Sequence, residues 1–276
     1  MLPYAWSVLR LLCVCALMVV ARVAVAAPAF TVEVTGKGRP VILIPGLGCP
    51  ARVWKTTAEH LAPSHEVHVL ALAGFAGQPA IDRAIPGAVK DDLIKYIQEH
   101  KLEKPVIIGH SMGGFVAFWL AEAAPTLVGP VISVDSGPSY GGGDPDILPW
   151  ARKKRDAYKA MSAKTFESTI RDRYTPMWID PKKHEAEIAA VVKSDRAAFA
   201  DAFYELYTVD LSRQLSKINV PVLAILADNP TVKIVREQMK PVKTAEFVLL
   251  PTRHFVMHDD FAGFTKALDA FLAAHP

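Results

Sequence analysis

The chain contains one serine whose surroundings favour nucleophilic chemistry. Ser111 lies in the pattern G-x-S-x-G, between Gly109 and Gly113, after a short apolar run at residues 106–108 and before an apolar helical pattern. A serine at a sharp turn between a strand and a helix presents its hydroxyl at the end of a sheet, and the flanking glycines avoid crowding that turn. This context predicts that Ser111 acts as a nucleophile.

A serine hydroxyl is a weak nucleophile at neutral pH, so it needs a base to remove its proton. His254 suits this role, because it follows the last apolar run, at residues 246–250, and precedes the final helical pattern. His258 is the competitor, but it begins the run His258-Asp259-Asp260, which is typical of a helix N-terminus. We therefore expect His254 to be the base and His258 to be a surface or supporting residue.

The elements that must position these side chains alternate along the chain. Short apolar runs, typical of strands buried in a parallel sheet, alternate with amphipathic helical patterns. This alternation predicts the α/β class, with a doubly wound, mostly parallel sheet and helices on both faces. The expected strands cover residues 31–35, 41–44, 67–70, 106–108, 131–134, 221–226 and 246–250. The expected helices cover residues 51–61, 86–100, 115–124 and 231–239, followed by a last helix that carries an apolar stripe from residue 261 to residue 271.

The first residues predict a secretory signal peptide. Arg10 precedes an apolar run, and the small residues that follow are typical of a cleavage site after Ala26. A retained membrane anchor is the alternative, but the run is short for a membrane span and Arg22 interrupts it. We expect export to the periplasm or the extracellular space, with no stable membrane span after cleavage.

The alternation stops between residues 136 and 218, where the pattern is helical and rich in charged and aromatic side chains. A helical insertion late in such a sheet is expected to cover the carboxyl ends of the strands, where ligands bind. The chain is therefore expected to divide into three parts. These are a signal peptide at residues 1–26, an α/β core at residues 27–136 and 219–276, and a helical cap at residues 137–218.

Composition narrows the range of partners. Cleavage removes two arginines and no acidic residue, so the formal net charge of +3 falls to +1, which is too small to favour nucleic acid or an anionic membrane.

Cys13 and Cys15 leave with the signal, so Cys49 has no partner for an internal disulfide. No Cys or His pair has the spacing of zinc ligands, so we expect no metal. Oligomeric state does not follow from the sequence.

In its order of motifs the chain resembles the α/β-hydrolase family over nearly all of the mature sequence. That family carries an oxyanion loop, G-x-S-x-G, a cap, an acidic residue and a histidine in a G-H-F-like motif. Here this last motif reads Arg253-His254-Phe255, with an arginine where the family usually has a small residue. The resemblance implies an α/β-hydrolase fold and a triad of serine, histidine and acid. It also implies that His110 is a packing residue.

The resemblance places the oxyanion hole on two backbone N–H groups. One belongs to Met112, directly after the nucleophile, and the other to Leu47, in the loop after residues 41–44. Most relatives carry His-Gly in that loop, whereas this chain reads Pro45-Gly46-Leu47-Gly48. Backbone donors tolerate such a change, because only the geometry of the loop matters.

The acidic member of the triad has two candidates. Relatives usually carry it after the penultimate strand, where this chain has Asp228 followed by Asn229, somewhat earlier than the usual spacing. Asp135 is the alternative, at the end of the strand after the Ser111 helix, where some families of this fold place the acid. We favour Asp228. A buried, hydrogen-bonded carboxylate at either position would fix the histidine tautomer and stabilise the imidazolium.

The cap contributes large and partly apolar side chains that could line an acyl or aromatic pocket. Aromatic residues at helical spacing are more often core than pocket, so we expect only a few to bind substrate, namely Met177 and Trp178. The other candidates are Trp150, Tyr158, Met161, Phe166, Tyr174, Phe199, Phe203 and Tyr204.

The sequence therefore predicts an exported serine hydrolase, most consistent with a carboxylesterase that acts on small-molecule esters of small or medium acyl chains and needs no cofactor. The same fold and triad also serve aminopeptidases, lactonases and thioesterases. A catalytically silent ligand-binding protein on this fold is a further alternative, against which the intact Ser111 motif and His254 argue.

Overall fold

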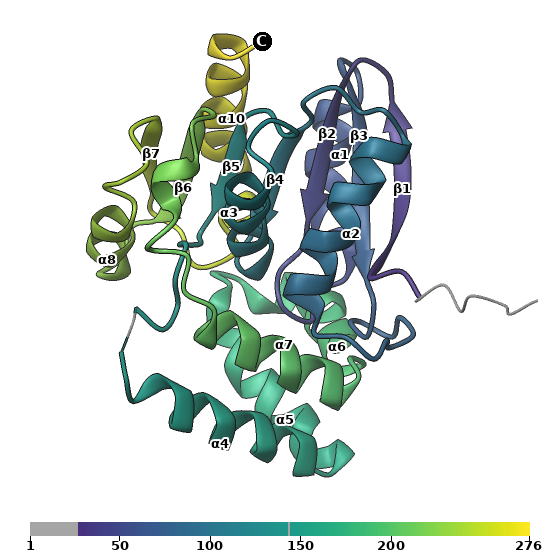
Figure 1. Ribbon diagram of the computed structural model, residues 1–276. Helices are drawn as coiled ribbons and strands as arrows, with labels where there is room; N and C mark the ends of the chain where they lie inside the picture. The colour runs from purple at the N-terminus through teal and green to yellow at the C-terminus, as the bar shows by residue number, and fades with distance from the viewer. Residues whose placement is uncertain (1–26, 143) are drawn as a thin grey trace, which may run out of the picture.

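The computed structural model describes residues 27–142 and 144–276, so the predicted signal peptide, residues 1–26, lies outside the described residues. Within the described part, seven strands form one sheet in the order β1-β3-β2-β4-β5-β6-β7 (Figure 1). Strand β1 pairs with β3 in antiparallel orientation, and every other neighbouring pair is parallel. The strands are β1 (Phe30–Gly36), β2 (Arg39–Ile44), β3 (His65–Leu72), β4 (Val106–His110), β5 (Val131–Val134), β6 (Val222–Ala227) and β7 (Ala245–Leu250).

The central strands are buried on both faces, as their continuous apolar sequences predict. Every residue of β4, β5 and β6 is buried, and so are the last four residues of β2. Strand β1 has an alternating sequence and lies at the edge of the sheet, where most of its side chains are partly or fully exposed. The predicted α/β class and mostly parallel sheet are therefore confirmed.

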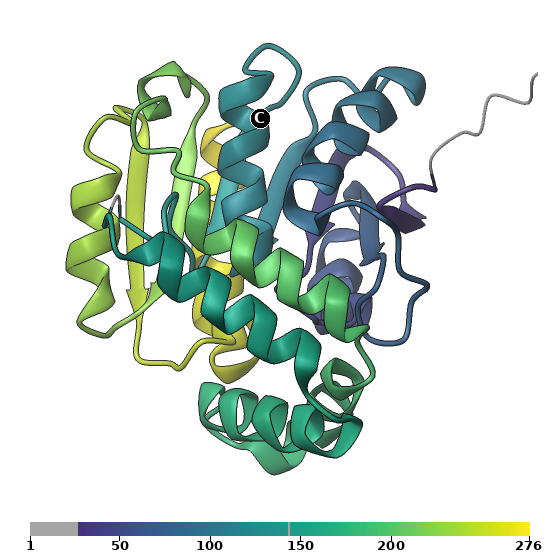
Figure 2. The same cartoon turned by 60° about the horizontal axis from the view of Figure 1, so that its bottom comes forward.

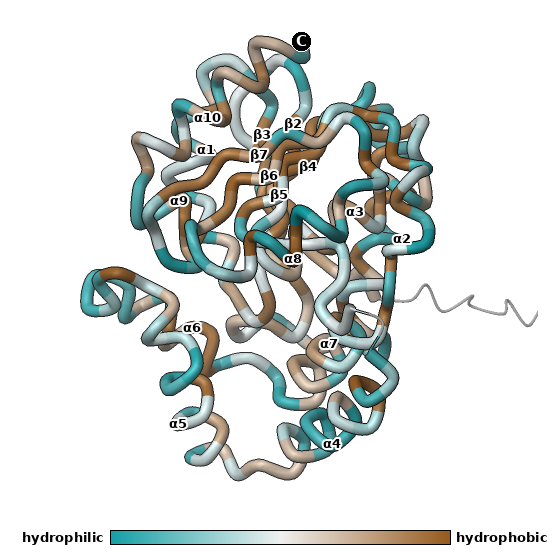
Figure 3. The backbone as a smooth tube through the Cα atoms, turned by 90° about the vertical axis from the view of Figure 1, so that its left-hand side faces the viewer, coloured by the Kyte–Doolittle hydropathy of each residue, from teal (hydrophilic) through white to brown (hydrophobic). Residues whose placement is uncertain are grey.

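Helices cover both faces of this sheet. Helices α1 and α10 lie on one face, whereas α2 and α3 pack together on the other, and Figure 3 shows the apolar strands between these two layers. The helices of the core are η1 (Ala51–Trp54, a 3₁₀ helix), α1 (Lys55–Leu61), α2 (Ile85–Glu99), α3 (Met112–Ala123), α8 (Thr231–Gln238), α9 (Val256–Asp259) and α10 (Phe261–Ala274). The side chain of Asp260 accepts a hydrogen bond of 2.9 Å from the Gly263 N–H, so the predicted helix N-terminus is the cap of α10.

A helical region is inserted between β5 and β6, and α4 and α7 run side by side in it (Figure 2). It lies over the carboxyl ends of the strands, because two of its side chains contact the loop after β2. The Tyr174 hydroxyl donates to the Leu47 carbonyl at 2.5 Å, and Ser194 Oγ donates to the Gly48 carbonyl at 3.3 Å. Its elements are α4 (Ile147–Ala160), α5 (Ala163–Tyr174), η2 (Thr175–Met177), η3 (Pro181–His184), α6 (Glu185–Val192), α7 (Arg196–Thr208) and η4 (Leu215–Lys217).

The limits that we predict for core and cap, residue 137 and residue 218, stay a prediction. Among residues 27–142 and 144–276, every helix is too short or too polar to cross a bilayer. In the same residues, no three His, Cys, Asp or Glu side chains are grouped so that they could hold a metal ion.

Candidate active site

Ser111 occupies the turn between β4 and α3 in a strained backbone conformation. Its φ of 53° lies in the left-handed region, which residues with a side chain rarely adopt. The two flanking positions must be glycine, because a Cβ atom at either one would overlap backbone atoms. A Cβ on Gly109 would lie 2.1 Å from the Gly113 carbonyl oxygen, and a Cβ on Gly113 would lie 2.2 Å from the Ile44 carbonyl oxygen. The motif therefore folds as its sequence predicts, into a tight turn that holds one serine at the end of the sheet.

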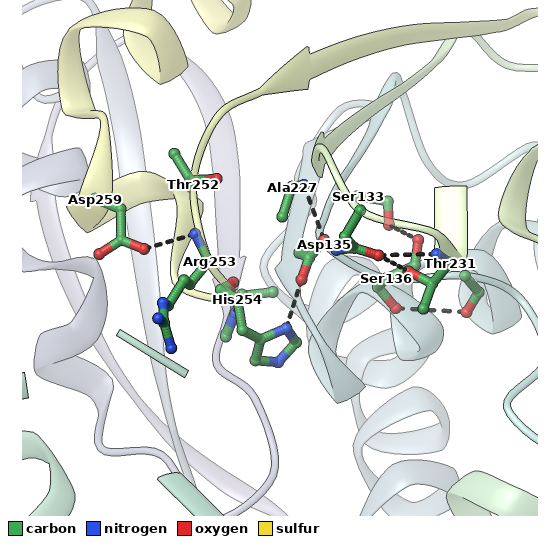
Figure 4. Close-up of polar contacts among 12 residues, drawn as sticks. Ser133, Asp135, Ser136, Ala227, Thr231, Thr252, Arg253, His254 and Asp259 are labelled. Carbon is green, nitrogen blue, oxygen red and sulfur yellow. Dashed lines mark hydrogen bonds and ion pairs between the residues drawn. The ribbon is translucent and has the colours of Figure 1, made fainter. Parts of the chain in front are cut away.

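His254 follows β7 and forms a hydrogen bond with Asp135, which follows β5 (Figure 4). The His254 Nδ1–H donates to Asp135 Oδ2 at 2.6 Å, and Asp135 Oδ1 accepts a 3.0 Å hydrogen bond from the Ala227 N–H. Because a carboxylate only accepts, this pairing puts the imidazole proton on Nδ1 and leaves Nε2 free to accept a proton. Asp135 itself has a left-handed φ of 44°, a strained conformation of the kind found at functional sites.

Asp228, the acid that we favoured from the sequence, does not meet His254. Its side chain is exposed, and no hydrogen bond among the described residues joins it to the imidazole. The Asp228 N–H donates to the Leu250 carbonyl at 2.8 Å, which extends the pairing of β6 with β7 by one residue. Strand β6 ends at Ala227 and helix α8 begins at Thr231. The short connection between them therefore holds Asp228 at the end of β6 and cannot bring it to His254. Asp135, the alternative, is the residue that contacts His254.

The loop that carries His254 is fixed by its neighbours. The Arg253 N–H donates to Asp259 Oδ2 at 2.9 Å (Figure 4). The Arg253 guanidinium donates to the Pro176 carbonyl at 2.8 Å. Arg253 is the residue that departs from the usual family motif. Its contact with Pro176 explains what an arginine does there, because it connects the histidine loop to the inserted helical region.

The two other histidines near Ser111 have structural contacts. His110 Nε2–H donates to the His254 carbonyl at 3.0 Å, and burial holds the pKa of His110 well below its ordinary value, with the nearby His254 adding to the effect. His258 Nε2–H donates to the Val53 carbonyl at 2.8 Å, and burial lowers its pKa as well. Both are therefore neutral packing residues near neutral pH, and neither takes the place of His254.

The predicted oxyanion donors have free N–H groups. Among the described residues, neither the Leu47 N–H nor the Met112 N–H donates to another group. Leu47 lies in the loop after β2, and Met112 is the first residue of α3, where N–H groups have no partner within the helix. Two backbone donors beside Ser111 are what stabilisation of a tetrahedral oxyanion requires.

Two adjoining cavities surround these residues. The smaller has a volume of about 100 Å³ and is lined by Ser111, Leu47 and His254, together with residues of the inserted region. The larger has a volume of about 620 Å³ and contains Asp135 and His254 in its wall. Met177, which we expected to bind substrate, lines both cavities. It therefore lies at their junction, and its contact with substrate stays a prediction.

Trp178, the second residue expected to bind substrate, lies elsewhere. It is 2% exposed and lines neither cavity. Its indole stacks on Phe255, with ring centroids 3.6 Å apart, and on His184, with centroids 4.0 Å apart. Trp178 thus packs the inserted region against the histidine loop, and the expectation of substrate contact is corrected to a structural role.

Two residues of the site escaped the sequence analysis. Tyr140 follows β5, and its hydroxyl shares a 3.1 Å hydrogen bond with Ser136 Oγ and interacts with the Ser111 side chain. Burial raises the pKa of Tyr140 to about 12, so this phenol stays protonated. Arg173, near the end of α5, lines the small cavity with Ser111. No motif marks either residue, because the fold of the insertion alone brings them to the serine.

Known proteins resemble this chain along most of its length. It is 24% identical over 256 residues to a pimeloyl-[acyl-carrier protein] methyl ester esterase of Aliivibrio fischeri strain MJ11, covering 88% of this chain and 97% of the relative. It is 28% identical over 262 residues to an N-formylmaleamate deformylase of Pseudomonas putida, covering 87% and 91% of the two chains.

A solved structure shows the same fold. A thermophilic esterase from Thermogutta terrifontis superposes with a TM-score of 0.77 at 22% identity, covering 90% of this chain and 94% of the esterase. The model of the alpha/beta hydrolase family matches residues 41–267, which include β2, the Ser111 turn, the inserted helices and the His254 loop. This match extends over far more than half of the sequence, and the chain therefore belongs to the α/β-hydrolase family.

Proposed function

We propose that the protein is a serine carboxylesterase that hydrolyses small-molecule esters of small or medium acyl chains with Ser111, His254 and Asp135 as its triad. The observation that carries this proposal is the 2.6 Å hydrogen bond from His254 Nδ1 to Asp135, on a histidine that shares a cavity with the strained Ser111. Known esterases among the distant relatives agree with it.

The first half of the reaction acylates Ser111. His254 Nε2 takes the hydroxyl proton as Ser111 Oγ attacks the ester carbonyl carbon. The negative charge that develops on the carbonyl oxygen is stabilised by the N–H groups of Leu47 and Met112, which have no competing acceptor among the described residues. When the intermediate collapses, the imidazolium of His254 gives its proton to the departing alcohol, leaving an acyl ester on Ser111.

The second half releases the acid. A water molecule gives a proton to His254 Nε2 and attacks the acyl carbon, and the same two N–H groups stabilise the second oxyanion. Ser111 then leaves with the proton from His254, which regenerates the free enzyme. Asp135 keeps the imidazole in the required tautomer and stabilises its cationic form in both halves. Each step uses only protein groups, the ester and water, so no cofactor is needed.

Ester hydrolysis by the purified chain tests this proposal. A series of p-nitrophenyl esters with acyl chains of graded length is expected to give saturable hydrolysis, with the highest kcat/KM among the shorter chains. Ser111→Ala and His254→Ala are each expected to reduce kcat by about 10⁴-fold or more, as removal of triad members does in known enzymes. Hydrolysis that continues unchanged in the folded Ser111→Ala variant would refute the proposal.

Cleavage of an amide is the second candidate, because one relative is an N-formylmaleamate deformylase. A serine nucleophile can cleave an amide through the same acyl-enzyme route as an ester. Amides differ from esters in their poorer leaving group, which must be protonated by His254 as it departs. Comparing an ester with the amide of the same acid distinguishes the two. An amide hydrolysed with the higher kcat/KM would assign the protein to that class instead.

A further inference from the structure

The cavity that contains Ser111 also contains a guanidinium group from the inserted helical region. Arg173 lies one residue before the end of α5, and it lines the cavity of about 100 Å³ together with Ser111, Leu47 and Tyr207. Its Cζ atom lies 5.3 Å from the centre of the Phe203 ring, and the Tyr207 phenol interacts with the guanidinium. The side chain therefore packs on the Phe203 ring and forms part of the cavity wall.

This guanidinium has no anionic partner among the described residues. Its Nε is inaccessible to solvent and hydrogen-bonds to nothing, and no aspartate or glutamate of the described residues lines the cavity. Arg171 on the same helix is a useful contrast. It pairs with Glu185 at 2.6 Å and with Glu167 at 3.1 Å on the surface. Among the described residues, Arg171 therefore has carboxylate partners, whereas Arg173, which shares a cavity with Ser111, has none.

A cation that is withdrawn from water without a counter-ion destabilises a fold, and arginine cannot relieve this by losing its proton. A ligand that supplies the missing negative charge would remove that cost. The planar guanidinium presents N–H donors in a geometry that matches a carboxylate, with which it can form two parallel hydrogen bonds. A carboxylate on the substrate would accept hydrogen bonds from the terminal N–H groups of this guanidinium and neutralise its charge.

The position of the two cavities indicates which end of the ester carries this carboxylate. The small cavity contains Ser111 and Leu47, so it adjoins the acyl carbon and the expected oxyanion site. The larger cavity of about 620 Å³ contains His254 but not Ser111, so it suits the alcohol that leaves with a proton from His254. At about 100 Å³ the small cavity has room for only a short acyl chain.

We propose that Arg173 binds a carboxylate on the acyl part of the substrate, so that the preferred substrates are monoesters of short dicarboxylic acids, of about the size of succinate. This inference rests on the proposed esterase function and specifies its substrate class. Arg173 is a substrate-binding residue in this account, because its contact with the carboxylate holds the ester carbonyl against Ser111.

The test compares two methyl esters of nearly equal shape. Monomethyl succinate carries a carboxylate where methyl isocaproate carries an isopropyl group. Wild-type protein is expected to hydrolyse monomethyl succinate with a kcat/KM at least about tenfold higher, and Arg173→Met is expected to lower that value by about 100-fold, since truncating one partner of a buried charge pair has effects of this order. Arg173→Met is expected to lower kcat/KM for methyl isocaproate much less, so that the ratio of kcat/KM between the two esters falls at least about tenfold.

Arg171→Met is the matched control, since it removes the same charge from the same helix outside the cavity. It is expected to change kcat/KM for both esters by less than about twofold. Arg173→Lys keeps the charge without the planar fork, so it is expected to fall between wild type and Arg173→Met. Equal hydrolysis of both esters by wild type, or equal losses on both in Arg173→Met, would overturn the inference while leaving the esterase function intact. Absence of hydrolysis of any ester would instead refute the function itself.

A second measurement needs no variant and so does not depend on the folding of Arg173→Met. Succinate is expected to inhibit hydrolysis of methyl isocaproate by the wild-type protein competitively, whereas succinamide, which has the same shape and no charge, is expected to inhibit at least about tenfold less strongly. Equal inhibition by the two compounds, or none by succinate, would contradict a carboxylate site in this cavity.

Discussion

Replacing Asp135 by asparagine tests the role of the acid with almost no change of shape. The Ala227 N–H donates to Asp135 Oδ1 at 3.0 Å, so the asparagine is expected to keep its carbonyl oxygen toward Ala227 and to turn its NH₂ group toward His254. An NH₂ donor needs Nδ1 as an acceptor, which moves the imidazole proton to Nε2. His254 can then no longer take the proton of Ser111, because Nε2, the nitrogen that acts as the base in the proposed mechanism, is already protonated.

The expected loss in kcat is about 10⁴-fold, the effect that this tautomer change has in serine proteases. That factor corresponds to about 5.4 kcal/mol of transition-state stabilisation, at about 1.36 kcal/mol for each tenfold change in rate. KM is expected to change little, because Asp135 acts through His254. The assay is steady-state hydrolysis of a p-nitrophenyl ester near neutral pH, with circular dichroism and thermal unfolding to establish that the variant is folded.

Asp228→Asn is the matched control, since it makes the same chemical change at an exposed site on the neighbouring strand end. It is expected to leave kcat and KM within about twofold of wild type, as surface substitutions usually do. A folded Asp135→Asn variant that retains more than about a tenth of the wild-type kcat would refute the assignment of the acid. Loss of activity in Asp228→Asn alone would return that role to Asp228.

Further expectations concern the turn, pH and export. Gly113→Ala places a Cβ 2.2 Å from the Ile44 carbonyl oxygen, so it is expected to lower the free energy of unfolding by about 1–3 kcal/mol or more, and urea unfolding at wild-type stability would contradict this. Burial lowers the pKa of His110 in the folded protein, so below its ordinary pKa of 6.5 only the unfolded chain takes up this proton. The contribution of neutral His110 to the free energy of unfolding is fully present above pH 6.5, and it is expected to fall by up to about 1.4 kcal/mol per pH unit as the pH decreases below that value. A free energy of unfolding that stays constant between about pH 8 and pH 5 in urea titrations would argue against this. Cleavage after Ala26 in a secreting host is expected to give a mature chain whose first residue by N-terminal sequencing is Ala27, and an intact N-terminus would contradict the signal peptide.

The sequence is most informative where local physical requirements are strict. The turn at Ser111 needs glycine on both sides, so the pattern G-x-S-x-G between an apolar run and a helical pattern indicates its own geometry. The strands were predictable for a similar reason, because those buried on both faces must be apolar throughout. His254 followed from its place between the last strand and the last helix.

The acid could not be chosen from the sequence, because the choice depends on which strand ends meet in space. Asp135 and Asp228 both follow buried strands, and each alone is compatible with a triad. The deciding features are tertiary. Asp135 turns back in a left-handed conformation and accepts the Ala227 N–H, whereas Asp228 continues the pairing with β7 and points to solvent.

The lining of the site was also beyond the sequence. Met177 and Trp178 are neighbours and both are large and partly apolar, yet one lies at the junction of two cavities and the other is stacked between Phe255 and His184. Arg173 lies in a charged helix and resembles a solvated residue by its pattern. Only the packing of the inserted helices over the sheet decides which of these side chains faces Ser111.

Covalent labelling of Ser111 tests the central claim most directly. A fluorophosphonate probe phosphonylates a serine hydroxyl that an adjacent base activates, and peptide mass spectrometry identifies the modified residue. We predict stoichiometric labelling of the folded protein at Ser111, no labelling after heat denaturation, and a rate of labelling at least about 100-fold lower in Asp135→Asn. A folded, soluble protein that remains unlabelled, or that is labelled at another serine, would contradict the claim that Ser111 is the nucleophile.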